Sequence, residues 1–339
     1  MGGASPHFHN KTLSMRRPAG IVQANMQQRF FSRLESAKSV LIAGAGGGFD
    51  IFSGLPLYFH LRAAGKTVHL ANLSFSDIHS AEGRFLTPAL LEVRWDTQSR
   101  ASYFPELHLC RWFRQRDEDV PIYCFDRAGI APITEGYARL VEELNPEAIV
   151  LVDGGTDSLM RGDEFGLGTP QEDLASIAAV DATAVPIKLL ACIGFGIDSF
   201  HGVCHAHFLE SVAALVQQGG YLGAWSFCRE MPEYESYRAA CEFVFERMPR
   251  HRSIVTSSIL SAVDGHFGDH HSTPRTDGSE LFINPLMSLY WAFELRAVVA
   301  RHLFLDRLRN TETYMEVSAR IAQCRSEHAP VRPWQSLPM

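Results

Sequence analysis

Glycines and an acid follow the first strongly apolar segment of the chain. The run Ser39–Ala43 leads directly into the sequence GAGGGFD, residues 44–50. Glycines have no Cβ, so the backbone N–H groups of such a loop can closely approach a bound phosphate. The alternative is a tight strand–helix turn that binds no ligand. We expect this loop to supply five ligand-binding residues: Gly44, Gly46, Gly47, Gly48 and Asp50.

A second loop, rich in acids, follows the apolar segment Ala148–Val152. Its sequence is DGGTDSLMRGDE, residues 153–164. Carboxylates at this density repel one another unless a cation or hydrogen-bond donors relieve the repulsion. We expect Asp153 and Asp157 to be catalytic, and an acid-rich surface turn is the alternative. The loop also supplies expected ligand-binding residues (Gly154, Gly155, Thr156 and Arg161) and two candidate metal ligands (Asp163 and Glu164).

Histidines are concentrated in two later segments. His201 and His205 are four residues apart, so a helix that begins near His201 would place both imidazoles on one face, where they could share a metal. Acid–base catalysis by one of these histidines without a metal explains the pattern equally well. We therefore expect both to be catalytic. His270, in the histidine-rich segment 265–274, is a further candidate metal ligand.

Short apolar segments alternate with helix-like segments along most of the chain. Expected strands are Val40–Ala43, Thr67–Ala71, Ile122–Phe125, Ala148–Val152, Ile187–Ile193, Tyr221–Trp225 and Ile254–Ile259. Expected helices are Gln23–Ser36, Leu55–Ala64, Glu135–Leu144, Gln171–Val180, Ala206–Gln218, Glu233–Arg247 and the C-terminal sections Asn284–Asn310 and Thr311–Cys324. The alternation predicts a doubly wound, Rossmann-like α/β fold with a mostly parallel sheet and a helical C-terminal section. Parallel strands end on one side of a sheet, so we expect the glycine-rich loop, the acid-rich loop and a third loop, Gly194–His207, to line one cleft.

The domain organisation follows from the absence of a linker rich in Pro, Gly or Ser. We expect residues 1–20 to be a flexible N-terminal arm and residues 21–329 to form a single α/β domain. Within that domain, residues 74–120 contain prolines and scattered aromatic residues, which indicate an irregular insertion that could cover the site as a lid. Residues 330–339 are expected to form a tail that trails over the surface.

Composition limits the classes of binding partner and the cellular compartment that we expect for the chain. The 339-residue chain is 46% hydrophobic and carries a net charge of −7, which argues against a nucleic-acid-binding surface. Its seven cysteines form no CxxC pair, which is typical of a reducing compartment. The apolar runs are too short to span a membrane, and residues 1–20 lack the apolar core of a signal peptide. We expect a cytoplasmic protein with a small-molecule substrate and no nucleic-acid or membrane partner; a homo-oligomer stays open.

Three nucleotide-binding patterns are matched only in part. The loop after Ala43 has the first two glycines of the dinucleotide motif G-x-G-x-x-G, but Phe49 replaces the third. The segment Thr67–Asn72 ends in Asn where NAD-binding units place an acid. Gly44-Ala45-Gly46 followed by Ser53–Pro56 also resembles the NAD loop of sirtuin deacylases, with a longer spacing. Gly-Gly-x-Asp-Ser at 154–158 resembles the loop of ATP pyrophosphatases, but Asp153 stands where those enzymes have Ser.

Three separated motifs together resemble one family. They are Gly46-Gly47-Gly48-Phe49-Asp50, then Asp153-Gly154-Gly155-Thr156-Asp157 with Gly162-Asp163-Glu164 behind it, and finally Asn284-Pro285-Leu286. In this order they resemble a conserved archaeal and bacterial family known as domain of unknown function 1152. The resemblance covers most of residues 38–310. It implies the fold and the location of the site, but no activity, because the family has none established.

The combined pattern favours an enzyme. We expect it to act on a small, polar, phosphate- or nucleotide-bearing molecule by hydrolysis or group transfer, with an Asp- and His-rich site at the carboxyl ends of the strands. The cofactor is not identified by the sequence; a divalent metal suits the acids and histidines. One alternative is an NAD(P)-dependent oxidoreductase. The other is a nucleotide-sensing or scaffold protein without catalysis.

Overall fold

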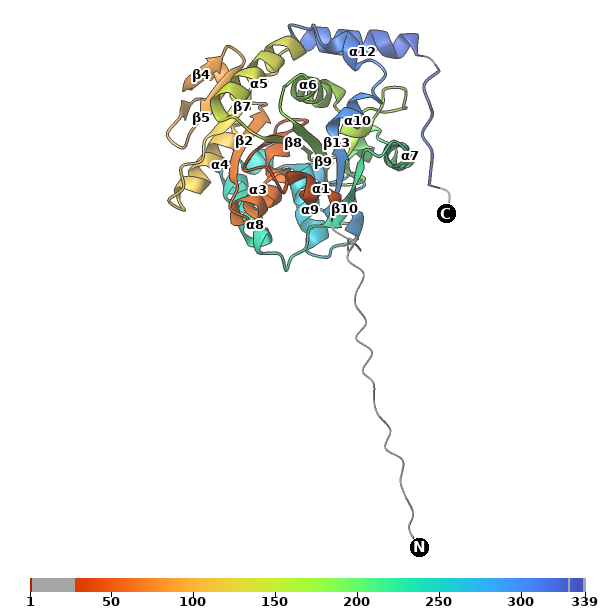
Figure 1. The fold of residues 1–339 in the computed structure, drawn as a ribbon, viewed down its shortest axis with the longest axis horizontal. Helices are drawn as coiled ribbons and strands as arrows, with labels where there is room; N and C mark the ends of the chain where they lie inside the picture. The colour runs from red at the N-terminus through yellow and green to blue at the C-terminus, as the bar shows by residue number, and fades with distance from the viewer. Residues whose placement is uncertain (2–27, 329, 338–339) are drawn as a thin grey trace.

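A nine-stranded sheet forms the centre of the molecule. The computed structural model describes Met1, residues 28–328 and residues 330–337 (Figure 1). The strand order is β10-β13-β9-β8-β1-β2-β7-β5-β4. The five strands from β9 to β7 are parallel, whereas β13 and β5 run antiparallel to both of their neighbours. The sheet is therefore mostly parallel, and the expected Rossmann-like α/β fold is confirmed.

The parallel strands and β10 lie where the apolar runs predict them. They are β1 (Ser39–Gly44), β2 (Thr67–Leu73), β7 (Ile122–Phe125), β8 (Ala148–Asp153), β9 (Ile187–Cys192) and β10 (Tyr221–Ser226). All residues of β8 are buried. A parallel strand is covered on both faces, so it is apolar throughout rather than at alternate positions. That is why these segments read as short continuous apolar runs.

Helices cover both faces of the sheet, as Figure 1 shows. Val40 and Ile42 of β1 pack into the core on one face, and Leu41 and Ala43 into the core on the other, because successive side chains of a strand point to opposite sides. The first face is covered by α1 (Arg29–Leu34), α2 (Asp50–Ser53), α3 (Leu55–Ala63), α4 (Pro105–Arg114), α8 (Pro232–Arg247) and α9 (Ile254–Val263). The second is covered by α5 (Ile130–Leu144), α6 (Pro170–Asp181), α7 (His205–Gln217), α10 (Leu295–Val299), α11 (Leu305–Leu308) and α12 (Tyr314–Glu327).

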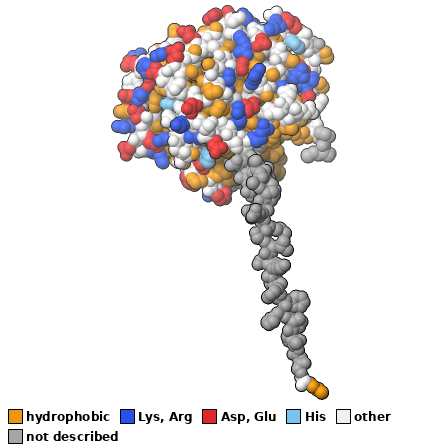
Figure 2. Space-filling model, viewed as in Figure 1, with side chains coloured by type: hydrophobic (Ala, Val, Ile, Leu, Met, Phe, Trp, Pro, Cys, Tyr) orange, Lys and Arg blue, Asp and Glu red, His pale blue; other side chains and the backbone are white. Residues whose placement is uncertain are grey.

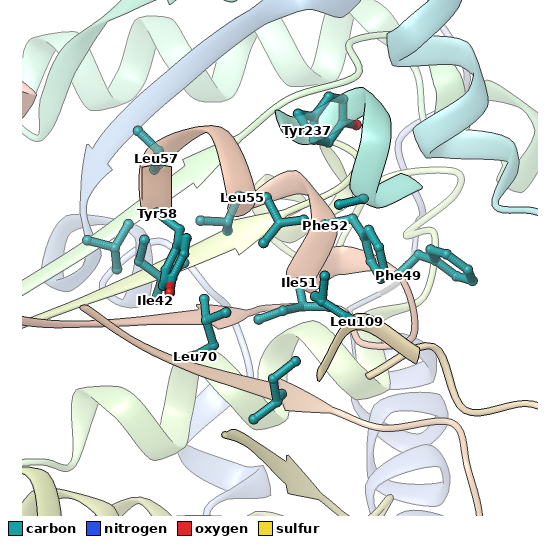
Figure 3. Packing of buried hydrophobic residues seen from close by; sticks show 14 of the residues in the cluster. Ile42, Phe49, Ile51, Phe52, Leu55, Leu57, Tyr58, Leu70, Leu109 and Tyr237 are labelled. Carbon is teal, nitrogen blue, oxygen red and sulfur yellow. The ribbon is translucent and has the colours of Figure 1, made fainter. Parts of the chain in front are cut away.

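The first of these cores packs closely around the start of α3. Figure 3 shows Ile42, Ile51, Phe52 and Leu55 gathered between strand β1 and the helices above it. Gly54 allows this approach, since a Cβ there would lie 2.7 Å from Cγ2 of Ile42. The packing fixes the chain that leaves the glycine-rich loop, and with it the position of Asp50.

The strand order reverses direction between β1 and β8. From β1 the chain moves to β2 and β7 on one side, then returns to place β8 and β9 on the other. The loops that follow β1 and β8 therefore diverge at the carboxyl ends of the strands. Such a switch point leaves a crevice in open α/β sheets, and ligands of this fold class bind there.

One expected strand, Ile254–Ile259, is wrong: the segment forms helix α9. Its β-branched residues favour a strand, but the side chain of Ser253 accepts a hydrogen bond from the backbone N–H of Thr256 at 3.1 Å and so caps a helix. The apolar residues at 254, 255, 259 and 262 then lie on helical spacing and pack against their neighbours. Capping and packing outweigh the β propensity here.

The expected helix Asn284–Asn310 is also wrong in part. Residues Leu289–Glu294 form strand β13, which lies between β9 and β10 and pairs antiparallel with both. Its aromatic residues are typical of a strand. Helices α10 and α11 form only after this strand ends. The C-terminal section Thr311–Cys324 is helical as expected, in α12.

The segment 74–120 contains more regular structure than the expected irregular insertion. Strand β5 (Leu90–Val93) pairs with β7, and β4 (Arg84–Thr87) pairs with β5, so the segment extends the central sheet. Short elements complete the described chain: η1 (Ile78–Ser80), β3 (Ala81–Glu82), β6 (Gln98–Ser99), η2 (Asp157–Leu159), η3 (Ile197–His201), η4 (Pro249–His251), β11 (Gly268–Asp269), η5 (Pro274–Thr276), β12 (Phe282–Ile283) and η6 (Pro285–Ser288).

The ends of the chain are described only in part. The expected arm at 1–20 and the first residues of the expected helix Gln23–Ser36 lie outside the described residues, apart from Met1; the described part of that helix is α1. None of the helices in the described ranges has the length and apolar character that a membrane crossing requires. On the face in Figure 2, basic and acidic side chains are interspersed.

The central strand β1 generates a first prediction, on stability. Ile42 is fully buried there. Ile42→Ala should lower the free energy of unfolding by about 2–5 kcal/mol, because it removes buried methyl groups and leaves a cavity. Val216→Ala on α7, at a position 53% exposed, should change it by about 0.5 kcal/mol or less. Urea unfolding of both variants checks this, and equal losses would contradict the packing of β1.

Candidate functional site

A cavity of about 450 Å³ lies at the switch point of the sheet. The loops after β1, β8 and β9 each contribute to it, as the strand-end argument predicts. From these loops it is lined by Gly46, Gly47, Phe49, Asp50, Ser53, Asp153, Gly154, Asp157, Asp198 and His201. Other segments close the remaining walls with Phe75, Tyr103, Thr169, His251, Ser253, Ile254, Val255 and Arg275.

Three carboxyl groups converge beside this cavity: Asp50 and Asp153 line its floor, and Asp173 meets them from α6 without lining it. Asp50, Asp153 and Asp173 each place an oxygen so that all three oxygens lie within 4.8 Å of one another. Asp153 and Asp173 are 2% and 1% exposed. Both oxygens of Asp173 are buried without a hydrogen-bond partner among the described residues. A buried carboxylate without a partner is strongly unfavourable, so this group needs a proton or a cation.

The glycine-rich loop makes room for these carboxyl groups. The N–H of Gly46 donates to Oδ2 of Asp50 at 2.6 Å. A Cβ at Gly46 would lie 2.8 Å from both Asp50 and Asp173, and a Cβ at Gly154 would lie 2.8 Å from Asp50. The N–H group of Gly46, which was expected to bind an external anion, thus binds a carboxylate of the protein itself.

The neighbouring loop residues have similar packing roles. A Cβ at Gly44 would lie 2.1 Å from Oδ1 of Asn72. The Nδ2 group of the same Asn72 side chain donates to the carbonyl oxygen of Gly48 at 2.7 Å. Gly47 and Gly48 have φ values of +99° and +61°, which favour glycine. Of the expected ligand-binding glycines in this loop, Gly46 and Gly47 line the cavity. Gly44 and Gly48 do not line it; Gly44 packs against Asn72, and Gly48 against Phe75 and Tyr103.

Two further acids are held by hydrogen bonds within the protein. Oδ2 of Asp198 accepts from the backbone N–H of Thr156 at 2.6 Å, and a Cβ at Gly155 would lie 2.6 Å from the same oxygen. Oδ2 of Asp157 accepts from the N–H of Thr169 at 2.7 Å and from its hydroxyl at 3.1 Å. Asp157 and Asp198 therefore each accept hydrogen bonds, whereas Asp173 accepts none from the described residues. The hydrogen bonds to Asp157 and Asp198 fix the shapes of the loops after β8 and β9.

Burial raises the pKa of five carboxyl groups at or beside the cavity: the three of the cluster, together with Asp157 and Asp198. It raises the pKa of Asp50 to about 7, and the negative charge of Asp157 adds to the rise. The pKa values of Asp153, Asp173 and Asp198 are raised well above the usual range, first by burial and then by neighbouring acids. Burial also raises the pKa of Asp157, against the effect of its Thr169 hydrogen bonds and of nearby His201. A bound cation would oppose all of these rises.

His201 and His205 are not brought together. His201 ends η3, Gly202 follows with a φ of +83°, and α7 begins only at His205. The turn at Gly202 breaks the helical spacing that would have put both imidazoles on one face. His201 lines the cavity, whereas the ring of His205 packs against Phe195, with centroids 5.1 Å apart.

The other candidate metal ligands also lie away from the cavity. His270 stacks on His266, with centroids 3.8 Å apart, and the two histidines line a separate pocket with Arg238 and Asp264. Among the residues that the structure describes, the one group of His, Cys, Asp and Glu close enough to hold a metal is the Asp50, Asp153 and Asp173 cluster.

Asp163 and Glu164 form ion pairs with the C-terminal tail instead of facing the cavity. Arg332 contacts each at 2.9 Å. Fully buried Glu164 also accepts from the backbone N–H of Arg161 at 2.9 Å, and the side chain of Arg161 lies 3.7 Å from Asp163. The tail was expected to trail over the surface; its described residues 330–337 are mostly exposed and are anchored by these contacts. Residues 338–339 lie outside the described chain.

Sequence reasoning missed several residues of the site. Asp173 lies in the first turn of α6. Acids are common at this position because the positive end of the helix dipole stabilises them, so the sequence gives no sign that this one belongs to a site. Asp198 follows β9 within the third loop and could have been selected by the same strand-end argument as Asp157. Tyr103, His251 and Arg275 come from segments without a recognisable motif.

The raised pKa values generate a prediction on pH. The pKa of Asp50 rises from 3.8 to about 7 on folding, so the folded protein binds more protons between these values. Its contribution to stability is complete below pH 4 and is lost as the pH rises through 7. In chelator-treated protein, we expect the free energy of unfolding to be about 1–3 kcal/mol lower at pH 8 than at pH 5. Urea unfolding across this range measures it. Asp50→Asn should flatten the dependence on pH, because it removes this titrating group, and an unchanged dependence would contradict the shift.

One protein family matches the sequence. Its description is "Protein of unknown function (DUF1152)", and the match spans residues 86–326. The match includes the loops after β8 and β9 and Asp173, but begins after the glycine-rich loop, whereas the resemblance of motifs was expected to cover residues 38–310. A comparison with curated proteins gives no match. Since the matched range spans well over half of the 339 residues, the chain belongs to the DUF1152 family.

Proposed function

We propose that this protein is a divalent-cation-dependent enzyme that hydrolyses or transfers a group of a small phosphate-bearing molecule. The observation that supports this proposal most directly is the cluster of Asp50, Asp153 and Asp173, with its unpartnered Asp173 carboxylate. A cation among these oxygens relieves both their mutual repulsion and the cost of burying them.

The type of donor selects the cation. Carboxylate oxygens are hard ligands, which favour Mg²⁺, Mn²⁺ or Ca²⁺ over metals that prefer sulfur or imidazole. Asp50 and Asp153 follow neighbouring parallel strands, and Asp173 approaches from α6, so the three oxygens face one point from different elements. When bound there, a divalent cation would polarise a substrate oxygen and lower the pKa of bound water.

The negative charge of these acids, together with a bound cation, favours a phosphate-bearing substrate. The floor of the cavity is acidic, so an anion binds next to it only when a cation lies between them. Arg275 lines the same cavity and supplies a positive charge to it. His201 is the candidate proton carrier, since it is the histidine of the strand-end loops that faces the cavity.

The oxidoreductase alternative is less well supported. A dinucleotide pyrophosphate is normally bound by free backbone N–H groups of the glycine-rich loop. Here the N–H of Gly46 already donates to Asp50, and Asp173 occupies the space beside it. A pyrophosphate at that point would face two carboxyl groups.

The cation site can be tested without knowing the substrate. Mn²⁺ at 100 times its Kd should raise the free energy of unfolding of the wild type by about 2.7 kcal/mol. In Asp173→Asn, most of this increase should be lost. The metal-free variant should be at least as stable as the wild type, because one buried charge has been removed. Thermal unfolding with and without Mn²⁺ measures both effects.

A matched control removes one charge elsewhere. Asp306 on α11 pairs with Arg309, and its side chain is 92% exposed. Asp306→Asn should retain the full Mn²⁺ response. An Asp173→Asn variant that is less stable than the wild type without metal, yet responds normally to Mn²⁺, would mean that the cluster is structural and would refute the proposed cation site.

The role of His201 generates a separate prediction. In the presence of Mn²⁺, His201→Gln should lower the turnover of a phosphate-bearing substrate by about 10²- to 10⁴-fold, the usual contribution of general acid–base catalysis. The Mn²⁺-induced stabilisation should stay unchanged, because His201 is not one of the three ligands. Turnover is followed by mass spectrometry on a panel of sugar phosphates and nucleotides.

His205→Gln is the control for this variant, since the ring of His205 packs on Phe195 outside the cavity. It should keep most of the turnover. Equal losses in the two variants would contradict the assignment of the proton carrier to His201.

A further inference from the structure

One part of the cavity lining is aromatic and apolar. Phe75 and Tyr103, from the segment between β2 and α4, form it together with His251, Ile254 and Val255 from the chain that follows α8. Phe75 is 38% exposed although it is a large apolar residue. The cavity lining therefore combines two chemically different surfaces, a charged one made by the acids and a flat, weakly polar one made by these rings.

These rings are held in place by their neighbours. The rings of Tyr103 and His251 meet edge to face, with centroids 5.6 Å apart. Phe75 rests on the glycine-rich loop, since a Cβ at Gly47 or Gly48 would come within 2.9 Å of its ring. The same absence of a Cβ at Gly48 leaves room for the Tyr103 hydroxyl, 3.1 Å away from where that Cβ would be. A rigid aromatic wall thus stands directly above the loop that carries Asp50.

The size of the cavity fits a ligand with both kinds of group. A volume of about 450 Å³ lies within the range of sites for whole small molecules and far exceeds the space of a single ion. Aromatic side chains bind nucleobases by stacking, and this contact tolerates any base because every base has a flat face. Arg275, also on the cavity wall, can stack on a base or contact a phosphate.

We infer that the substrate is a nucleoside phosphate whose base lies against Phe75, Tyr103 and His251 while its phosphate faces the Asp50, Asp153 and Asp173 cluster. This inference rests on the proposed function and narrows its substrate class. The ribose links the two groups, and the reacting phosphate shares the cavity with His201. A phosphate ester without a base contacts only the charged surface.

The test compares ligands that differ only in the base. Calorimetric titration of the Mn²⁺-loaded protein uses AMP, GMP, CMP, UMP and ribose 5-phosphate. At least one nucleotide should bind 10-fold or more tightly than ribose 5-phosphate. Tyr103→Leu should lower the affinity for that nucleotide by about 5- to 150-fold, the range for loss of one base–aromatic stack. Phe75→Leu provides a second variant should Tyr103→Leu fail to fold.

The controls separate this inference from the proposed function. Phe282→Leu removes an aromatic ring that is 60% exposed and lies outside the cavity, so it should keep the full preference for the nucleotide. Equal affinity for ribose 5-phosphate and all four nucleotides would overturn the base site and leave the phosphate enzyme intact. Binding of none of the five ligands, with the Mn²⁺ response preserved, would overturn the phosphate-bearing substrate itself.

Discussion

Mutual repulsion among buried carboxyl groups is the constraint on which the rest of the site depends. Asp50, Asp153 and Asp173 are held within 4.8 Å by three separate elements, each fixed by the packing of the sheet and its helices. A protein does not relax such a cluster by local motion when its backbone is set by a parallel sheet. The folded state therefore carries an electrostatic cost that only protonation or a cation removes, and this couples stability, pH and ligand binding at one place.

The close approach of these carboxyl groups also accounts for two glycines beside them. Gly46 and Gly154 both lie beside carboxyl oxygens of the cluster, and a Cβ at either position would collide with them. A glycine-rich loop after a first strand is usually interpreted as a cradle for phosphate. In this protein its clearest role is to let acids approach closely; under the proposed function, an anion would then be bound through a cation rather than by bare backbone N–H groups.

The sequence predicts the central sheet well because buried parallel strands are continuous apolar runs, as in β8. It fails at α9 and β13, where helix capping by Ser253 and pairing between two existing strands decide the outcome. For the site, the strand-end argument finds Asp50, Asp153, Asp157 and His201. It cannot find Asp173, which joins the carboxyl cluster from α6, or Tyr103, which lines the cavity, because tertiary packing places both and neither follows a strand of the parallel set.

Arginine ion pairs distinguish two sets of acids in this protein, those that have a basic partner and those of the cluster, which have none in the part of the chain that the structure describes. Asp163 and Glu164 belong to the same acid-rich loop as Asp153, yet they receive Arg332 from a tail far away in the sequence. Within the described residues, no arginine or lysine forms an ion pair with Asp50, Asp153 or Asp173. If the acids of this loop served only to shape a surface turn, compensation would be as useful at Asp153 as at Glu164. Arg332 instead neutralises Asp163 and Glu164 and leaves the cluster without a cationic partner among the described side chains, which is the distribution of charge that the proposed cation site requires.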